Sequence, residues 1–315
     1  MQWIKRAIGG LGITLVLSLG ALAAYAYYPE QEDITSLEKK YSLPGSHFEN
    51  IAGLRAHYNI QGAGPDLILL HGNSSNLHEF DAVRPILAER FRVITVDLPG
   101  QGLTAEPAGR DYSIETFNRF IAAFVEKVQA DAKVSIVGSS MGGYWAMQYA
   151  QAHAENVSKL VLASSYGGIC AGRDYSRSTP LDEMPVIRDV VAYFVPKFVV
   201  RQILEADYYR PPAPDHLVQM FYDMLRKPGL RTFEANFSKY PKDRLAIDAD
   251  RLLPVNKLII GGEFDQSHDT CETRNLQERL QNAEFTQIKN VGHVPFLETP
   301  DAMRTLLMDF LTRTP

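Results

Sequence analysis

Cysteine is scarce in this sequence, with two cysteines among 315 residues. That number is too small for a disulfide-rich scaffold or for a four-cysteine zinc site. Internal repeats and low-complexity tracts are also missing, and 45% hydrophobic with 22% charged residues is ordinary for a globular protein. The chain is therefore expected to bury a substantial core, as about two domains or as one large α/β domain with an insertion.

An excess of basic residues is missing as well. The formal net charge is -5 at pH 7, whereas nucleic-acid-binding domains usually carry a basic stripe, so no nucleic-acid partner is expected. Residues 100–105 imitate a dinucleotide-binding fingerprint after a predicted strand, but Glu106 and Pro107 follow where a helix should begin. Histidines and cysteines do not have the spacing of a zinc site. We therefore expect neither a cofactor nor a metal.

The first 30 residues have the pattern of a membrane segment. Lys5 and Arg6 precede an uncharged run from Ala7 to Pro29, and acidic residues begin at Glu30. A membrane-spanning helix needs about 20 apolar residues, whereas the apolar part of a cleaved signal has about 7–15. The run therefore favours an uncleaved anchor, and the basic residues before it place the N-terminus inside.

The expected localisation follows from this orientation. The body after the anchor is expected on the non-cytoplasmic side, attached to the membrane through the N-terminal segment. Ala24-Tyr25-Ala26 offers a small-x-small cleavage site, so a secreted or periplasmic protein after signal cleavage is the alternative.

Short apolar runs alternate with helical patterns in the body. The runs are rich in β-formers and bounded by turn residues, as buried strands are. They are Leu67–Leu70, Val93–Val96, Val134–Val137, Val157–Leu162, Val255–Ile260 and Phe285–Ile288. Helical patterns begin after Ser113, a good N-cap, and at Thr299, which a proline and a first-turn acid follow. This alternation predicts a mostly parallel sheet with helices on both faces.

One region breaks the alternation. Residues 167–250 contain no clear strand but many prolines, aromatic residues and methionines, which predicts a helical cap inserted between two strands. Most of its apolar side chains should pack in a core, and a few should line an apolar pocket. The predicted organisation is an anchor or signal segment at 1–30, a linker at 31–46, a first core part at 47–166, the cap at 167–250 and a second core part at 251–315.

The sharpest motif is a G-x-S-x-G pattern at residues 138–142, centred on Ser140. It lies directly between a predicted strand at 133–137 and a predicted helix at 143–153, which is the setting that a nucleophile elbow requires. Small residues let the turn close tightly, so that the serine oxygen projects above the sheet edge. The pattern predicts a nucleophile at Ser140, and this context disfavours a glycine-rich turn without chemistry.

A nucleophilic serine needs a base, and the base needs an acid. His293 is the best of eight histidines, because it follows the last predicted strand and loops after parallel strands meet at one sheet edge. Asp265 follows the strand before it, in the chain order serine, aspartate, histidine that goes with such an elbow. Glu263 and Asp269 are nearby alternatives for the acid.

A tetrahedral oxyanion needs backbone donors. One is expected from Met141, whose amide opens the helix after the serine. The second is expected from the loop at 71–73, where the backbone N–H of Asn73 is the best candidate. A simple tight turn is the alternative interpretation of that loop.

With these residues the chain resembles the α/β-hydrolase superfamily, in the branch of esterases and lipases with a helical cap. The resemblance is carried by His71-Gly72, by residues 97–102, by the elbow at Ser140 and by Gly292-His293. It covers about His47 to the C-terminus. It implies an α/β-hydrolase fold with an eight-stranded sheet and the cap inserted after the strand that ends near Ser165.

The resemblance also bears on individual residues. It strengthens Asp265 as the acid and implies a structural role for Asp97. Serine at position 140 separates the chain from the haloalkane dehalogenase and epoxide hydrolase branches, which place an aspartate there. Cys170 and Cys271 each follow the end of one of two strands that the family fold places side by side. In an exported body a disulfide between them is one expectation, and two free thiols are the other.

The expected activity is that of a serine hydrolase. A carboxylesterase for hydrophobic short- to medium-chain acyl esters is favoured, acting through an acyl-enzyme without a cofactor, because the predicted cap is rich in apolar side chains. Within the resemblance, a lactonase, an amidase or a carbon–carbon bond hydrolase with the same triad is the alternative. In another class, the alternative is a ligand receptor on a non-catalytic hydrolase scaffold.

Overall fold

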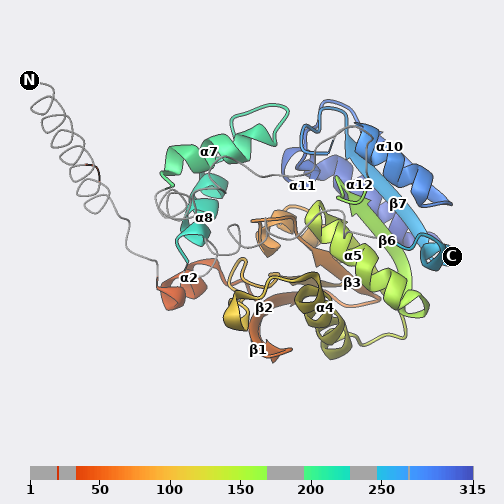
Figure 1. The fold of residues 1–315 in the computed structure, drawn as a ribbon, viewed down its shortest axis with the longest axis horizontal. Coiled ribbons are helices and arrows are strands. Elements are labelled where there is room, and N and C mark those ends of the chain that lie inside the picture. The colour runs from red at the N-terminus through yellow and green to blue at the C-terminus, as the bar shows by residue number, and fades with distance from the viewer. Residues whose placement is uncertain (1–19, 21–32, 169–194, 228–246, 269, 315) are drawn as a thin grey trace, which may run out of the picture.

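The computed structural model describes residues 20, 33–168, 195–227, 247–268 and 270–314. Within these residues, eight strands form one sheet in the order β1-β2-β4-β3-β5-β6-β7-β8. The β1–β2 and β2–β4 pairs are antiparallel, and every other neighbouring pair is parallel. The predicted mostly parallel eight-stranded sheet is confirmed, and Figure 1 shows its strands packed between helices.

The elements have these bounds. The strands are β1 (Ser46–Ile51), β2 (Leu54–Gln61), β3 (Asp66–Leu70), β4 (Arg92–Val96), β5 (Val134–Ser139), β6 (Val157–Ala163), β7 (Asn256–Gly262) and β8 (Ala283–Ile288). The helices named below are α2 (Ile34–Tyr41), α3 (Arg84–Leu87), α4 (Ile114–Val128), α5 (Met141–Ala152), α7 (Lys197–Ala206), α8 (Asp215–Leu225), α10 (Thr270–Arg279), α11 (Pro295–Glu298) and α12 (Pro300–Thr312), with the 3-10 helices η1 (Leu77–Phe80) and η5 (Asp250–Leu252). All six strands expected from apolar runs are present.

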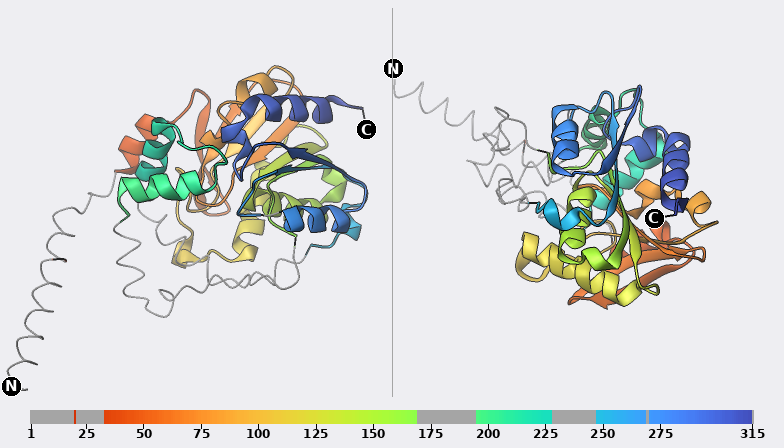
Figure 2. Two further views of the ribbon diagram at one scale, coloured as in Figure 1. Left: turned by 90° about the horizontal axis from the view of Figure 1, so that it is seen from above. Right: turned by 90° about the vertical axis from the view of Figure 1, so that its right-hand side faces the viewer.

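Helices cover both faces of the sheet, as expected. Side chains of β3 alternate between two apolar cores: Ile68 and Leu70 pack with α4, α5 and α10, whereas Leu67 and Leu69 pack with α3 and α12. This is the period of two that a strand buried on both faces shows. Figure 2 shows α12 on the opposite side of the sheet from α4 and α5.

Helix α2 lies inside the segment expected to be a linker. Leu37 is its buried residue, at 1% exposure. Lys40 Nζ and Tyr41 Oη each donate a hydrogen bond to Asp223 Oδ2 of α8, both at 2.6 Å. A polar, short helix is therefore held in place by a carboxyl far away in the sequence, and α2 lies next to α8 (Figure 1).

The region predicted as a cap is described in part. Helices α7 and α8 lie between β6 and β7 in sequence and pack together through Leu204, Tyr208, Ala213 and Val218. Residues 169–194 and 228–246 lie outside the described residues, so the cap limits at 167 and 250 stay predictions.

Two further expectations concern the chain ends and the cysteines. The predicted anchor at 1–30 lies, apart from Gly20, outside the described residues. None of the helices in the described ranges combines the length and the apolar character that crossing a bilayer needs. Cys271 of α10 is disulfide-bonded, so the expectation of a free thiol is wrong for this residue. Cys170, the other cysteine in the sequence, lies outside the described ranges.

Candidate active site

Ser140 sits at the turn between β5 and α5, in a strained conformation. Its backbone has φ 49° and ψ -116°, a region that costs a non-glycine residue about 1–3 kcal/mol. Hydrogen bonds on both sides hold it there: its N–H donates to Ala163 O at 2.8 Å, and its carbonyl accepts from Tyr166 at 3.2 Å. The strand-turn-helix setting predicted for the motif is present.

Glycine at two positions lets this turn form. A Cβ on Gly138 would lie 2.4 Å from Gly143 Cα, and a Cβ on Gly142 would lie 2.1 Å from Leu70 O. Real Cβ atoms do not approach backbone atoms so closely, because the contact is far inside van der Waals distance. Helix α5 therefore starts directly against β5 and β3, and any side chain at 138 or 142 would push Ser140 out of place.

His293 and Asp265 meet at this turn, although Ser140 is far away from both in sequence. His293 Nε2 is 3.0 Å from Ser140 Oγ. His293 Nδ1 is 3.0 Å from both Oδ1 and Oδ2 of Asp265. A carboxylate only accepts, so Nδ1 carries the hydrogen and Nε2 is left to accept the Ser140 hydroxyl proton. The structure thus brings the three predicted residues into one hydrogen-bonded chain.

Their surroundings shift the titration of the acid and the base in opposite directions. Burial alone would raise the pKa of Asp265, but the hydrogen bond and charge of His293 hold that pKa below its usual value. Burial alone would lower the pKa of His293, but the hydrogen bond and charge of Asp265, with the charges of Asp207 and Glu79, raise it above 6.5. The arrangement therefore stabilises an imidazolium beside the serine.

Within the residues that it describes, the structure does not place either of the two alternative acids beside His293. Glu263 is exposed and its Oε2 accepts the N–H of Asn290 at 3.0 Å. Asp269 lies outside the described residues. Asp265 is further fixed by the N–H groups of Ser267 and His268, which donate to its Oδ1 at 3.0 and 2.7 Å.

The loop at 71–73 lies beside the elbow, as expected for an oxyanion site. A Cβ on Gly72 would lie 3.3 Å from Ser140 Cβ. His71 clamps this loop: its Nε2 accepts the N–H of Leu98 at 3.0 Å, and its Nδ1–H donates to Gly72 O at 2.7 Å. Burial lowers the pKa of His71, so this clamp is neutral.

The backbone N–H groups near Ser140 are not equally available to bind an oxyanion. The N–H of Gly72 donates to Glu79 Oε2 at 3.0 Å. Met141 is the first residue of α5, and the first N–H groups of a helix have no acceptor within the helix. The amides of Met141 and Asn73 stay the predicted oxyanion donors.

Asp97 has the structural surroundings that the resemblance implied. It is 1% exposed, and it accepts hydrogen bonds from the N–H groups of Leu77 and Leu103, both at 2.7 Å. His57 Nδ1 lies 2.7 Å from its Oδ2. Burial raises the pKa of Asp97, but His57, His71 and the N–H of Leu103 together lower it to about 2.

Three groups around the triad escaped sequence reasoning. The carbonyl of Asp207 accepts the backbone N–H of His293 at 2.7 Å. Glu79 holds Gly72, and His268 lies against the ring of His293. A histidine three residues after the predicted acid was a readable signal, whereas Asp207 and Glu79 stand in segments without a motif.

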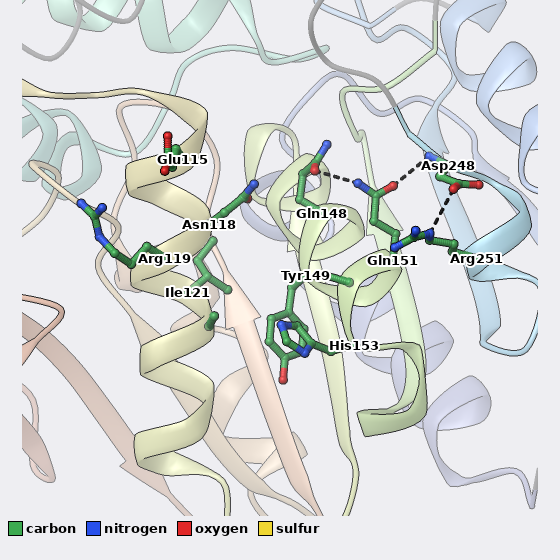
Figure 3. Close-up of a pocket in the computed structure, with 12 residues that line it drawn as sticks. Glu115, Asn118, Arg119, Ile121, Gln148, Tyr149, Gln151, His153, Asp248 and Arg251 are labelled. Carbon is green, nitrogen blue, oxygen red and sulfur yellow. Dashed lines mark hydrogen bonds and ion pairs between the residues drawn. The ribbon is translucent and has the colours of Figure 1, made fainter.

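A hollow of about 470 Å³ lies elsewhere, between α4, α5 and η5 (Figure 3). Its labelled lining includes Glu115 and Arg119 on α4 and Gln148 on α5, and Asp248 and Arg251 close one end. It includes none of the three triad residues, so it is separate from the site around Ser140.

Comparison with known proteins adds the family. A family model described as alpha/beta hydrolase fold matches residues 65–300. The chain belongs to that family. The resemblance inferred from the sequence motifs is thereby confirmed, and the comparisons support a hydrolase.

This α/β hydrolase has relatives that are named for different reactions. It is 26% identical over 283 residues to 2-hydroxy-6-oxo-6-(2'-aminophenyl)hexa-2,4-dienoic acid hydrolase of Metapseudomonas resinovorans, covering 88% of this chain and 94% of the relative. It is 28% identical over 262 residues to pimeloyl-[acyl-carrier protein] methyl ester esterase of Neisseria meningitidis, covering 82% and 96%. A solved membrane phospholipase A, described as a bacterial virulence factor, shares the fold with a TM-score of 0.66 and 22% identity, covering 98% of both chains.

Proposed function

We propose that this α/β hydrolase is a serine carboxylesterase for hydrophobic short- to medium-chain acyl esters. The observation that carries the proposal is the hydrogen-bonded chain from Ser140 Oγ through His293 to Asp265, with each link at 3.0 Å. A serine oxygen becomes nucleophilic when a base of this kind takes its proton during attack.

In the proposed reaction Ser140 Oγ attacks the ester carbonyl carbon while His293 Nε2 takes the hydroxyl proton. Asp265 keeps the imidazole in the required tautomer and stabilises the imidazolium. The N–H groups of Met141 and Asn73 bind the oxyanion of the tetrahedral intermediate. Its collapse breaks the bond to the alcohol oxygen, which receives the proton from His293.

Water then completes the cycle. His293 takes a proton from a water molecule as the water oxygen attacks the acyl-enzyme carbonyl, and the second tetrahedral intermediate expels Ser140 Oγ, which regains its proton. Acid and alcohol are the products, and the enzyme returns to its starting state.

An apolar acyl or alkyl group fits the surroundings of the base. Leu204, Tyr208 and Val218 of the region predicted as a cap pack with Val294 and Leu297, which lie one and four residues after His293 in the chain. The pimeloyl methyl ester esterase relative supports ester cleavage, and the phospholipase A with the same fold places phospholipids among the esters to be tested.

Carbon–carbon bond hydrolysis is the second candidate, because one relative is named for a dienoic acid substrate of that reaction. The purified protein should be assayed with a 4-nitrophenyl ester chain-length series, phospholipids, a lactone series, aryl amides and a 2-hydroxy-6-oxo-dienoate. Ester turnover above that of the other classes supports the proposal, and faster dienoate cleavage would replace it.

The alternative, a ligand receptor on a non-catalytic scaffold, can be distinguished from an esterase by covalent labelling. A fluorophosphonate probe should label the wild-type protein and not Ser140→Ala, since labelling needs an activated serine. An unlabelled wild type that still binds a small ligand would favour the receptor.

We also propose attachment to a membrane with the catalytic body on the non-cytoplasmic side. The uncharged run from Ala7 to Pro29, with Lys5 and Arg6 before it, supports this orientation. Protease added to intact spheroplasts should cleave the body, and a body that stays protected would contradict the orientation. A body released from the membrane at the Ala24-Tyr25-Ala26 site would favour the cleaved form.

A further inference from the structure

Glu79 is a buried acid next to the nucleophile that the proposed reaction does not use. It belongs to η1, directly after the loop that carries Asn73, and is 5% exposed. Acids are rarely buried so deeply unless they are paired. Among the described residues, its one hydrogen bond comes from the backbone N–H of Gly72, at 3.0 Å to Oε2.

The backbone of Gly72 lies between this carboxyl and the elbow. A Cβ built on Gly72 would lie 3.3 Å from Ser140 Cβ and 3.7 Å from Glu79 Oε2. Because residue 72 is a glycine, it adds no side chain between the acid and the serine. The backbone next to Glu79 is anchored by Phe80, which packs edge-on against Phe296 with ring centroids 4.9 Å apart.

The charge of Glu79 acts on neighbouring titratable groups. Together with Asp265 and Asp207 it raises the pKa of His293 against the effect of burial. It also adds to the rise in the pKa of Tyr208 that burial produces. Within the described ranges, no lysine or arginine forms an ion pair with Glu79.

The negative field of Glu79 discriminates between substrates by charge. A neutral ester meets Glu79 at little electrostatic cost, whereas a carboxylate brought beside Ser140 meets a like charge where the dielectric constant is low. Like-charge juxtaposition is a common device by which a site rejects the wrong partner.

We propose that Glu79 is the specificity-determining residue that makes this site take neutral esters and reject esters that carry a carboxylate near the scissile bond. The inference rests on the proposed esterase function and names the substrate class of that same site. It assigns the expected preference for neutral esters to the charge of one side chain.

The test compares kcat/KM for two pairs of esters that differ in charge. On the acyl side the pair is 4-nitrophenyl hexanoate and the mono-4-nitrophenyl ester of adipic acid. On the alcohol side it is 3-acetoxybenzamide and 3-acetoxybenzoate. The wild type should prefer the neutral member of at least one pair by about tenfold or more, a size that one like charge at short range produces.

Glu79→Gln removes the charge and keeps an oxygen that accepts the Gly72 N–H. It should shrink the neutral preference at least about fivefold, through faster hydrolysis of the anionic ester. Glu79→Asp keeps the charge and should keep the preference. Glu284→Gln makes the same change in net charge at an exposed ion pair with Arg313 and should leave the preference unchanged.

A second readout separates charge from a structural role in the loop. Among the described residues, the titratable groups that act on His293 are Asp265 and His268 from the segment after β7, Asp207 from the end of α7, and Glu79 from η1. Removing one negative charge lowers the pKa of His293, so the acid limb of kcat/KM for the neutral ester should move to lower pH in Glu79→Gln. Glu79→Asp should leave that limb in place.

The proposal is overturned if Glu79→Gln changes the preference less than about twofold in both pairs. Thermal unfolding confirms that each variant is folded, and Glu79→Ala takes the place of Glu79→Gln if the latter does not fold. Failure of the esterase function has a different signature, because a wild type that hydrolyses neither neutral ester and takes no fluorophosphonate label overturns both proposals at once.

Discussion

The ring of His268 lies against the ring of His293, with their centroids 5.0 Å apart and their planes inclined by 60°. His268 Nδ1 is 2.7 Å from Oε2 of Glu272. Burial lowers the pKa of His268, and the nearby His293 lowers it further, against the effect of Glu272. The pKa values of these two buried histidines are thus shifted in opposite directions. Because His268 stays neutral, it does not repel a proton on His293.

His268→Phe tests this arrangement. The phenyl ring fills the space against His293 but removes the donor to Glu272, which is 3% exposed. Losing a buried hydrogen bond to a carboxylate costs about 1–3 kcal/mol, so the free energy of unfolding should fall by about that amount in urea titrations. Because His268 is neutral in the wild type, the acid limb of activity should stay in place. A limb that moves by a whole pH unit would show that His268 is charged.

The acid limb of the pH profile of kcat/KM should reflect the raised pKa of His293. Only neutral His293 can take the serine proton, so kcat/KM should fall as the pH falls through that pKa, at a pH above 6.5. In Asp265→Asn the hydrogen-bonded charge that raises the pKa is gone, and the limb of the residual activity should move to lower pH. A wild-type limb well below 6.5 would contradict the arrangement of charges around His293.

The identity of the acid can be tested by a matched pair of substitutions. Asp265→Asn should lower kcat about 1,000- to 10,000-fold, because an asparagine no longer fixes the tautomer of His293. Glu263→Gln, at an exposed neighbouring position, should retain activity near that of the wild type. If Asp265→Asn keeps most of the activity, the assignment of the acid is wrong.

Asp223 should contribute to stability by joining α2 to α8. It is 3% exposed and accepts hydrogen bonds from Lys40, Tyr41 and Gln219. Asp223→Asn should lower the free energy of unfolding by about 1–3 kcal/mol, whereas Asp215→Asn at an exposed position of the same helix should cost much less.

The carboxyl of Asp223 should also make the stability of the protein depend on pH. Burial would raise the pKa of Asp223, but its three hydrogen bonds and the charge of Lys40 lower it. A depressed folded-state pKa contributes stability that is present above the unfolded value of about 4 and is lost as the pH falls through the folded value. The stability difference between wild type and Asp223→Asn should therefore shrink in acid, and a constant difference down to pH 2 would contradict it.

Sequence patterns were sufficient where a local feature decides the structure. The apolar runs predicted β3 to β7 because both faces of these strands are almost entirely buried. The short run Phe285–Ile288 also predicted β8, although that strand is half-exposed. The strands β1 and β2 left no such run: β1 is mostly half-exposed, and its antiparallel pairing with β2 at the sheet edge depends on partners across a turn. The polar helix α2 was expected to be a linker, because its contacts with Asp223 join residues that are distant in sequence.

The same distinction holds at the site. The proximity of Ser140, Asp265 and His293 could be predicted because each lies within five residues after the end of a strand, and the carboxyl ends of parallel strands converge. The hydrogen bond between Asp207 and His293 depends on how the chain is folded after α7. The one between Glu79 and Gly72 depends on the short 3-10 turn η1. Such contacts depend on tertiary packing that no local pattern records.

The central claim, that His293 makes Ser140 a nucleophile, can be tested by trapping the acyl-enzyme. The protein is mixed with excess 4-nitrophenyl hexanoate, quenched in acid within the first turnover, and measured by intact-mass and peptide mass spectrometry. We predict a mass increase of one hexanoyl group, located on the peptide that contains Ser140 and missing in Ser140→Ala and His293→Ala. Ester turnover that continues in Ser140→Ala, or an acyl group found on a different residue of the active wild type, would contradict the account.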